Sequence, residues 1–319
     1  MWKQAVLCLA AACGAPASHP SSDIDAHPQN GDASGSASID APVSTGSDPA
    51  NDGTSAVSEA TVSIPGATSG HTLPATIYTP SGVATPALVV ISPGFQMART
   101  QYATYAHHLA TWGFEVILTD YADQSFFADH QLMANDVGAV ISYALAPAFT
   151  PAVDATKIAL AGHSLGGDIS VLAATGDPRV KAVVGWDPVD ASNPSVVPDK
   201  MNTFTAKLAV IGETTDGSGG FMPCAPTADN YAAFYAAAPS PAFAMTVNGA
   251  DHMDWVDDGT CALCTLCTAG TASPDLAHAA TRRLNVTWLR ATLFADSSQQ
   301  TWLMAPPEVT AGTASIQHK

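Results

Sequence analysis

A serine between glycines is the sequence feature with the clearest chemistry. Gly162-His163-Ser164-Leu165-Gly166 forms a G-x-S-x-G pattern, which follows a short apolar run at 157–161 and opens a helix predicted over 166–174. In such a strand–turn–helix setting the serine stands on a sharp turn that exposes its hydroxyl, and the glycines avoid collisions on either side. The N-terminus of the helix also favours developing negative charge. The pattern therefore predicts that Ser164 is a nucleophile.

Two backbone amides near this serine are candidates for an oxyanion hole. Backbone N–H groups in that position stabilise the negative oxygen that forms during acyl transfer. One donor is expected from Leu165, directly after the serine. The other is expected from the loop Ser92-Pro93-Gly94-Phe95-Gln96, which follows an apolar run at 88–92, with Phe95 as the donor.

The histidine that activates the serine is expected after the last predicted strand, since the chain order on such a site is serine, acid, histidine. His252 lies in the segment 248–255, directly after an apolar run at 242–247. It is the predicted base. Several other histidines lie too early, within the serine turn or on predicted helices, and are expected to be ordinary core or surface residues: His71, His107, His108, His163 and His278.

Two aspartates are candidates for the acid that orients His252. Asp187 ends the apolar run at 180–186, and Asp216 follows the run at 207–211. Both keep the expected chain order. Spacing alone favours Asp216 slightly, and each also fits a turn position without catalytic function. The residues by themselves leave the choice open.

Apolar runs and helical patterns alternate along the chain after about residue 60. Runs typical of buried parallel strands occur at 88–92, 114–120, 157–161, 180–186, 207–211 and 242–247. Helical patterns occur at 100–112, at 129–145 and from 273 through 291. Residues 60–78 are typical of an antiparallel pair that opens the sheet. This alternation predicts an α/β fold, with a mainly parallel central sheet and helices on both faces.

The N-terminal part of the sequence is typical of a targeting segment followed by a tether. Residues 1–13 have one lysine and then a short apolar run, which predicts a signal peptide and export. Leu9-Ala-Ala-Ala-Cys13-Gly resembles a bacterial lipoprotein box, so Cys13 is a lipidation candidate, with simple secretion as the alternative. Residues 14–58 are rich in Ser, Asp, Gly, Ala and Pro, and predict a disordered tether. The folded domain is then expected over 59–319.

The net charge restricts the classes of partner. The 319 residues include 11 Lys and Arg against 28 Asp and Glu, a formal net charge of −17. A chain this acidic repels nucleic acid and anionic membrane surfaces. We therefore expect no nucleic-acid partner, and membrane association only through a lipid anchor. The composition does not determine the oligomeric state.

Four cysteines belong to the predicted domain: Cys224, Cys261, Cys264 and Cys267. An even number suits two disulfides in an oxidising compartment. The run Cys261-Ala-Leu-Cys264-Thr-Leu-Cys267 also allows a metal site, but export and the absence of a second paired cluster favour disulfides. The spacing does not reveal the pairing, and no metal or organic cofactor is expected.

Several segments together resemble the chlorophyllase branch of the α/β-hydrolase superfamily. They span about residues 85–295 and are Pro93-Gly-Phe95, Gly162-His-Ser-Leu-Gly-Gly167, Gly185-Trp-Asp-Pro-Val-Asp190, Pro223-Cys-Ala-Pro226 and Asp251-His-Met-Asp-Trp-Val-Asp-Asp258. That branch is close to platelet-activating-factor acetylhydrolases and, more distantly, to cutinase-like polyester hydrolases. The resemblance implies the α/β-hydrolase fold, ester cleavage, Asp187 as the acid, and Cys224 close to the cluster around Cys264. Chlorophyllases commonly carry Arg where this chain has Leu165, which weakens chlorophyll as the substrate.

The expected reaction is hydrolysis of a carboxylic ester through an acyl-enzyme on Ser164. Large apolar residues near the motif loops are expected to bind a hydrophobic part of the ester: Trp186, Phe221, Met222 and Met253. A cutinase-type polyester hydrolase and a thioesterase or peptidase are alternatives that use the same three residues. A tethered binding protein without turnover is the alternative from a different class.

Overall fold

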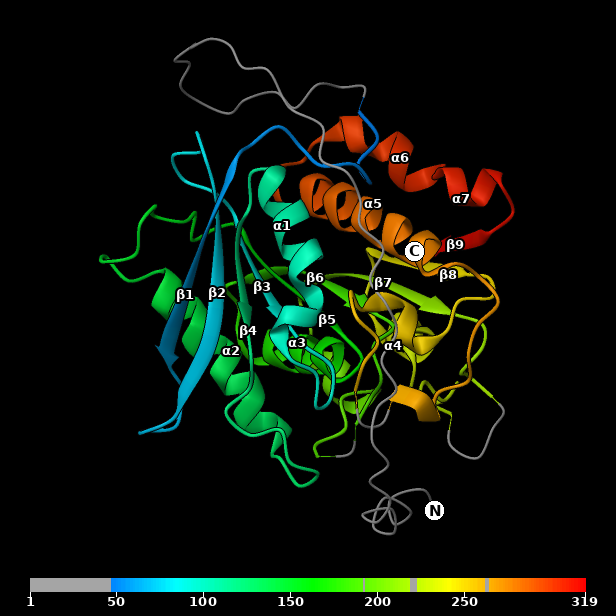
Figure 1. The fold of residues 1–319 in the computed structure, drawn as a ribbon, viewed down its shortest axis with the longest axis horizontal. Coiled ribbons are helices and arrows are strands. Elements are labelled where there is room, and N and C mark those ends of the chain that lie inside the picture. The colour runs from blue at the N-terminus through cyan, green and yellow to red at the C-terminus, as the bar shows by residue number, and fades with distance from the viewer. Residues whose placement is uncertain (1–46, 192, 219–222, 262–263) are drawn as a thin grey trace, which may run out of the picture. The chain divides into compact units, whose positions relative to one another are not determined.

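The computed structural model describes residues 47–191, 193–218, 223–261 and 264–319. The strands in these ranges form one nine-stranded sheet, which is seen with its helices in Figure 1. The strands are β1 (Val57–Pro65), β2 (Thr72–Pro80), β3 (Leu88–Ser92), β4 (Glu115–Thr119), β5 (Ile158–His163), β6 (Val180–Trp186), β7 (Lys207–Glu213), β8 (Ala242–Val247) and β9 (Ala314–His318). Their order across the sheet is β1-β2-β4-β3-β5-β6-β7-β8-β9. From β4 to β8 neighbouring strands pair in parallel, and antiparallel pairs form both edges.

Helices cover both faces of this sheet, and each face has its own apolar core. The helices are α1 (Ala103–Thr111), α2 (His130–Ala144), α3 (Leu165–Gly176), α4 (Tyr231–Ala237), α5 (Pro274–Leu293), α6 (Gln300–Met304) and α7 (Pro307–Thr310). Buried side chains of α2, α3 and α4 pack on one face, and those of α1 and α5 pack on the other. A mainly parallel sheet covered on both faces is the architecture that the alternating sequence pattern predicts. The fold is that of an α/β hydrolase.

The central strands follow the sequence prediction closely. β6 and β8 have the predicted bounds, and α2 differs from the predicted helix by one residue at each end. β9, which pairs antiparallel with β8 at the sheet edge, is not predicted from the sequence. Only its first residue, Ala314, is buried, so the strand lacks the apolar pattern by which the central strands are found.

The expected boundary between tether and domain, at residue 58, is wrong. The carbonyl oxygen of Asn51 accepts hydrogen bonds from His108 Nε2 at 3.0 Å and from Trp112 Nε1 at 2.9 Å. A Cβ on Gly53 would lie 2.3 Å from the carbonyl oxygen of Thr111, so this close approach requires glycine. Contacts with α1 therefore order the segment from residue 47 onward. The predicted signal peptide, Cys13 and the rest of the predicted tether lie outside the described residues.

A buried arginine joins the two ends of the domain. Arg283 on α5 donates to Asp48 at 2.9 and 2.7 Å and also to Glu308 on α7. The side chains of Arg283 and Glu308 are 6% and 5% exposed. None of the helices in the described ranges is both long and apolar enough to cross a membrane.

Replacing Arg283 with Leu is expected to destabilise the domain by ~3 kcal/mol, because the buried carboxylate of Glu308 loses its countercharge. Thermal unfolding of the two proteins measures the difference. Arg282→Leu is the matched control, because Arg282 is the next residue along the chain and its guanidinium makes no ion pair among the described residues. An equal loss of Tm in both variants would contradict an electrostatic function of Arg283.

Candidate active site

Ser164 stands between β5 and α3 on a sharp turn. Its φ of +54° lies in the left-handed region, which costs energy for any residue other than glycine. The turn is possible because its glycines let the backbone approach closely. A Cβ on Gly162 would lie 2.4 Å from backbone atoms of Gly166, and one on Gly166 would lie 2.1 Å from the carbonyl oxygen of Ser92. The turn presents Ser164 at the carboxyl ends of the parallel strands.

The imidazole of His252 lies between Ser164 and Asp187. Its Nε2 is 2.9 Å from Ser164 Oγ, and its Nδ1 is 2.6 Å from Asp187 Oδ2. Because a carboxylate faces Nδ1, that nitrogen carries the proton and Nε2 accepts the serine hydroxyl. This geometry brings together three residues that sequence analysis singled out, and it fits general-base activation of Ser164.

The loop that carries His252 is held by several carboxylate contacts. His252 begins a short 3₁₀ helix, η4 (His252–Trp255), whose N-cap is Asp251. Asp251 accepts from the N–H of Met253 at 2.8 Å and from that of Gly270 at 2.6 Å. These bonds fix both ends of the loop and limit the positions of the imidazole.

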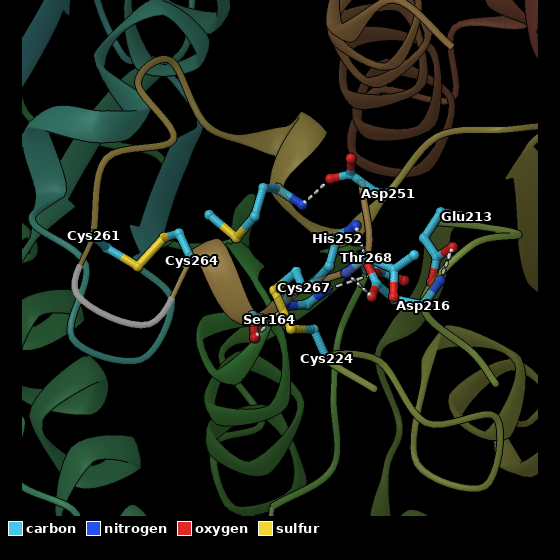
Figure 2. Close-up of a disulfide and its surroundings, with 12 residues drawn as sticks. Ser164, Glu213, Asp216, Cys224, Asp251, His252, Cys261, Cys264, Cys267 and Thr268 are labelled. Atoms are coloured by element: carbon cyan, nitrogen blue, oxygen red, sulfur yellow. Dashed lines mark hydrogen bonds and ion pairs between the residues drawn. A yellow bond between two sulfur atoms is a disulfide. The ribbon is translucent and has the colours of Figure 1, made fainter. Parts of the chain in front are cut away.

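Asp216, the other candidate acid, contacts the backbone of this loop and not the imidazole. Its Oδ2 accepts from the N–H of His252 at 3.0 Å, and its Oδ1 accepts from the N–H of Thr268 at 2.8 Å (Figure 2). Asp216 therefore braces the two segments that flank the cysteine cluster. The structure assigns the two aspartates different positions, with Asp187 alone at Nδ1 of His252.

Negative charges around His252 favour its protonated form. Burial lowers the pKa of the imidazole, but the hydrogen bond and charge of Asp187, with the charges of Asp216 and Glu213, outweigh this and raise the pKa above 6.5. Glu213 is also perturbed, because burial and the charge of Asp187 raise its pKa to about 7. Glu213 is not predicted from the sequence: it ends β7, two residues after the apolar run at 207–211, and no motif marks it.

Replacing Glu213 with Gln is expected to shift the acid limb of the kcat/KM profile to lower pH. The neutral amide removes a charge that raises the pKa of His252, and it keeps an acceptor oxygen for the N–H groups of Thr215 and Asp216. Since the base must be neutral to accept a proton, a lower pKa retains activity in more acidic solution. The pH dependence of ester hydrolysis by both proteins measures the shift.

Glu115→Gln is the matched control for this experiment. Burial raises the pKa of Glu115 to about 7 as well. Glu115 is the first residue of β4, so it lies at the amino edge of the parallel sheet, whereas Ser164 and His252 lie at the carboxyl edge. Its substitution should leave the acid limb in place. An unchanged profile for Glu213→Gln would show that this carboxylate does not act on His252.

A buried chain of hydrogen bonds connects the loop after β3 to the histidine loop. His163 Nε2 donates to the carbonyl oxygen of His252 at 2.9 Å, and Tyr102 donates to His163 Nδ1 at 2.9 Å. The Tyr102 oxygen accepts in turn from the N–H of Gly94 at 3.1 Å. Burial, together with the charge of His252, holds the pKa of His163 well below 6.5, so His163 stays neutral. His163 is a core residue, as expected, but it also positions the site, and no sequence signal marked its partner Tyr102.

Of the two expected oxyanion donors, one directly follows Ser164 and the other lines the same cavity as Ser164. Leu165 is the first residue of α3, where backbone N–H groups have no partner within the helix. Phe95 follows β3 and lines the same cavity as Ser164, with its ring edge-on to Phe126 at a centroid distance of 5.1 Å. The neighbouring Gln96 adopts a φ of +55°, which turns the chain sharply after Phe95.

A cavity of about 200 Å³ opens beside the serine and histidine. Of the residues expected to bind substrate, Met253 lines it. Trp186 does not, because its side chain is fully buried, its indole donates to Asn285 at 2.9 Å, and its ring packs on Tyr105. The expectation for Trp186 is therefore corrected: it is a core residue beneath the site. Phe221 and Met222 lie outside the described residues.

The four domain cysteines form two disulfides, Cys224–Cys267 and Cys261–Cys264. This confirms the disulfide prediction and gives the pairing, which spacing did not reveal. Both bridges line the cavity next to Ser164. Figure 2 shows the four cysteines with Ser164 and His252. Within the described ranges, no group of His, Cys, Asp or Glu side chains is arranged to hold a metal ion.

Comparisons with known proteins agree with this fold. Cutinase est1 of Thermobifida alba is 26% identical over 168 residues, which cover 52% of this chain and 52% of that protein. Cutinase est2 of the same organism is 29% identical over 116 residues, covering 35% of this chain and 38% of its own length. The chain thus spans about half or less of the curated relatives it matches. The model of the chlorophyllase family matches residues 48–316, almost the whole described domain, and the chain therefore belongs to the chlorophyllase family.

Proposed function

We propose that this protein hydrolyses carboxylic esters through an acyl-enzyme on Ser164. The observation that carries the proposal is the line of hydrogen bonds from Asp187 through His252 to Ser164. Family membership and the two cutinases among its relatives support the same class of reaction. The pairing of a serine with a histidine and a buried carboxylate is the arrangement that acyl transfer requires.

The reaction proceeds in two halves. His252 takes the proton from Ser164 Oγ as that oxygen bonds to the ester carbonyl carbon, and the N–H groups of Leu165 and Phe95 stabilise the oxyanion. The carbon–oxygen bond to the alcohol then breaks, and His252 gives its proton to the leaving alcohol. In the second half, a water takes the place of the alcohol: His252 deprotonates it as its oxygen bonds to the acyl carbon. The bond between that carbon and Ser164 Oγ then breaks, Oγ takes the proton back from His252, and the carboxylic acid leaves. Asp187 stabilises the imidazolium in both halves.

The surroundings of Ser164 favour a hydrophobic ester. The cavity is lined mainly by apolar and sulfur-containing side chains, and Phe95 and Met253 both contact it. Apolar walls with a few directed polar groups are typical of sites that bind small apolar molecules. Two disulfides also fit an exported protein, since disulfides persist in oxidising compartments.

A polyester or cutinase-type substrate is the second candidate. Phe126 and Phe127 are 52% and 78% exposed, and Phe126 packs against Phe95 at the cavity. Exposed apolar side chains next to a reactive site suit an extended apolar surface better than a free ester. Release of acid from a polyester film, set against hydrolysis of soluble esters, separates the two candidates.

The test of the proposal is hydrolysis of p-nitrophenyl esters from acetate to palmitate, combined with fluorophosphonate labelling. We expect turnover with a preference among the chain lengths, and a single labelled peptide that contains Ser164. A matched thioester and amide check the thioesterase and peptidase alternatives. A protein that neither turns over any ester nor takes the label would be a binding protein on this fold, and the proposal would be withdrawn.

A further inference from the structure

More than half of the described residues that line the cavity beside Ser164 contain sulfur. Six of the described residues that line the cavity carry sulfur: Met97, Cys224, Met253, Cys261, Cys264 and Cys267. The cysteines are all in disulfides, so they present neutral, polarizable sulfur pairs and no thiolate. Met97 Sδ lies 3.9 Å from Cys264 Sγ, which makes this part of the wall continuous.

The wall carries no permanent charge among the residues that the structure describes. None of its lining side chains is Asp, Glu, Lys or Arg, and its ionisable groups are His252 and His163. Burial keeps His163 neutral, and His252 is occupied by Ser164 and Asp187. The nearby carboxylate of Asp251 is turned toward the backbone of its own loop. A charged group of a substrate would therefore lose its hydration here without gaining a countercharge.

The space beside Ser164 is small. Its volume of about 200 Å³ lies below the roughly 300 to 1,000 Å³ of pockets that take drug-sized ligands. A compact group fits such a space better than a long acyl chain, most of which would extend outside. The cavity therefore selects by size as well as by polarity.

We propose that this sulfur-lined cavity binds a single uncharged aromatic ring of the ester, attached next to the scissile bond. The proposal rests on the proposed ester hydrolysis and names the class of ester. Sulfur is attracted to aromatic rings at about 5 Å, often at the ring edge, whereas a saturated ring of equal carbon number offers only dispersion.

The experiment compares esters that differ only in the saturation of one ring. Methyl benzoate and methyl cyclohexanecarboxylate place the ring on the acyl side, whereas benzyl acetate and cyclohexylmethyl acetate place it on the alcohol side. Each kcat/KM is divided by the rate of hydroxide hydrolysis of the same ester, which removes intrinsic reactivity. In wild type we expect the corrected aromatic-to-saturated ratio to exceed 1 in one pair, and that pair identifies the side of the ester that enters the cavity.

Substitutions at the wall test whether sulfur causes the preference. Met97→Leu and Met253→Leu keep apolar side chains of similar volume and remove sulfur. Together they should lower the ratio by about threefold, equivalent to ~0.7 kcal/mol, which lies within the range of sulfur–aromatic contacts. Met133→Leu is the matched control, because Met133 is a buried methionine of α2 in the core on the other face of the sheet. It should leave the ratio unchanged.

The results separate this proposal from the proposed function. Ester hydrolysis through Ser164 with a corrected ratio at or below 1 in both pairs would overturn the aromatic-ring assignment and leave the esterase intact. A ratio above 1 that the methionine substitutions do not lower would also overturn it, because the preference would then come from elsewhere. Failure to hydrolyse or label with any ester or fluorophosphonate would remove both.

Discussion

Replacing Ser164 with Ala is expected to lower kcat by about 10⁶-fold, the magnitude found when a serine nucleophile of a comparable site is removed. In the proposed mechanism Ser164 Oγ bonds to the acyl carbon, and it lies 2.9 Å from His252 Nε2. Without it His252 has only water to activate. A residual acceleration of about 10³ to 10⁴ over the uncatalysed reaction should persist, because the oxyanion donors and the binding cavity remain.

The substitution should leave the fold intact, so that loss of activity reports chemistry. Alanine is smaller than serine and meets the same backbone strain at a φ of +54°. Thermal unfolding of the variant should match wild type, and the fluorophosphonate label should disappear. Ser142→Ala on the exposed side of α2 is the matched control, and it should retain both activity and labelling. Turnover by Ser164→Ala at anything near the wild-type rate would exclude Ser164 as the nucleophile.

The parts of the site that the sequence predicted are those with a local signature. Ser164 lies in a five-residue pattern between a buried strand and a helix, and His252 directly follows the last parallel strand. The parallel strands themselves are short and fully apolar, because both of their faces are buried. Such features depend on neighbours in the chain, so they can be identified before the fold is known.

The remaining parts depend on contacts between distant segments. Asp187 and Asp216 end adjacent strands, and nothing in their spacing says which one faces an imidazole 36 or more residues later. The resemblance to a family favoured Asp187, and the geometry agrees. Trp186 was misassigned because a large apolar residue next to a catalytic loop fits a substrate pocket and a core position equally well. Its fully buried side chain, hydrogen-bonded to Asn285 on α5, could be placed only by the packing of α5 on the sheet.

The segment around Asp48 is also ordered by contacts with distant parts of the chain. A composition rich in Ser, Asp, Gly and Pro is typical of disorder. Here one aspartate pairs with the buried Arg283, more than two hundred residues later, and Asn51 bonds to two side chains of the α1 region. Polar residues can thus be held in place by a partner that the local sequence does not contain.

Replacing Asp187 with Asn is expected to lower kcat by about 10⁴-fold with little change in Tm. The amide presents an N–H to Nδ1 of His252, which moves the imidazole proton to Nε2, and Nε2 then cannot accept from Ser164. Stability should hold, because the substitution removes a buried negative charge whose Oδ1 has no hydrogen-bond partner among the described residues. Burial raises the pKa of Asp187, although the hydrogen bond and charge of His252 act to lower it. The ionised form of this carboxyl is therefore already disfavoured by its surroundings.

Asp216→Asn is the matched comparison, and its expected pattern is the opposite. Asp216 uses both oxygens for backbone N–H groups, so an amide keeps one bond and loses the other, which costs about 1 to 3 kcal/mol for a buried unpaired donor. Tm should therefore fall by several degrees. The imidazole retains its hydrogen bond to Asp187, so kcat should stay within about tenfold of wild type. This loss is smaller than the one expected for Asp187→Asn, in which His252 adopts the wrong tautomer. If Asp216→Asn instead abolished turnover at unchanged Tm while Asp187→Asn remained active, Asp216 would be the acid. The negative charge that stabilises the imidazolium would then come from Asp216, whose carboxylate in this structure accepts from the backbone N–H groups of His252 and Thr268.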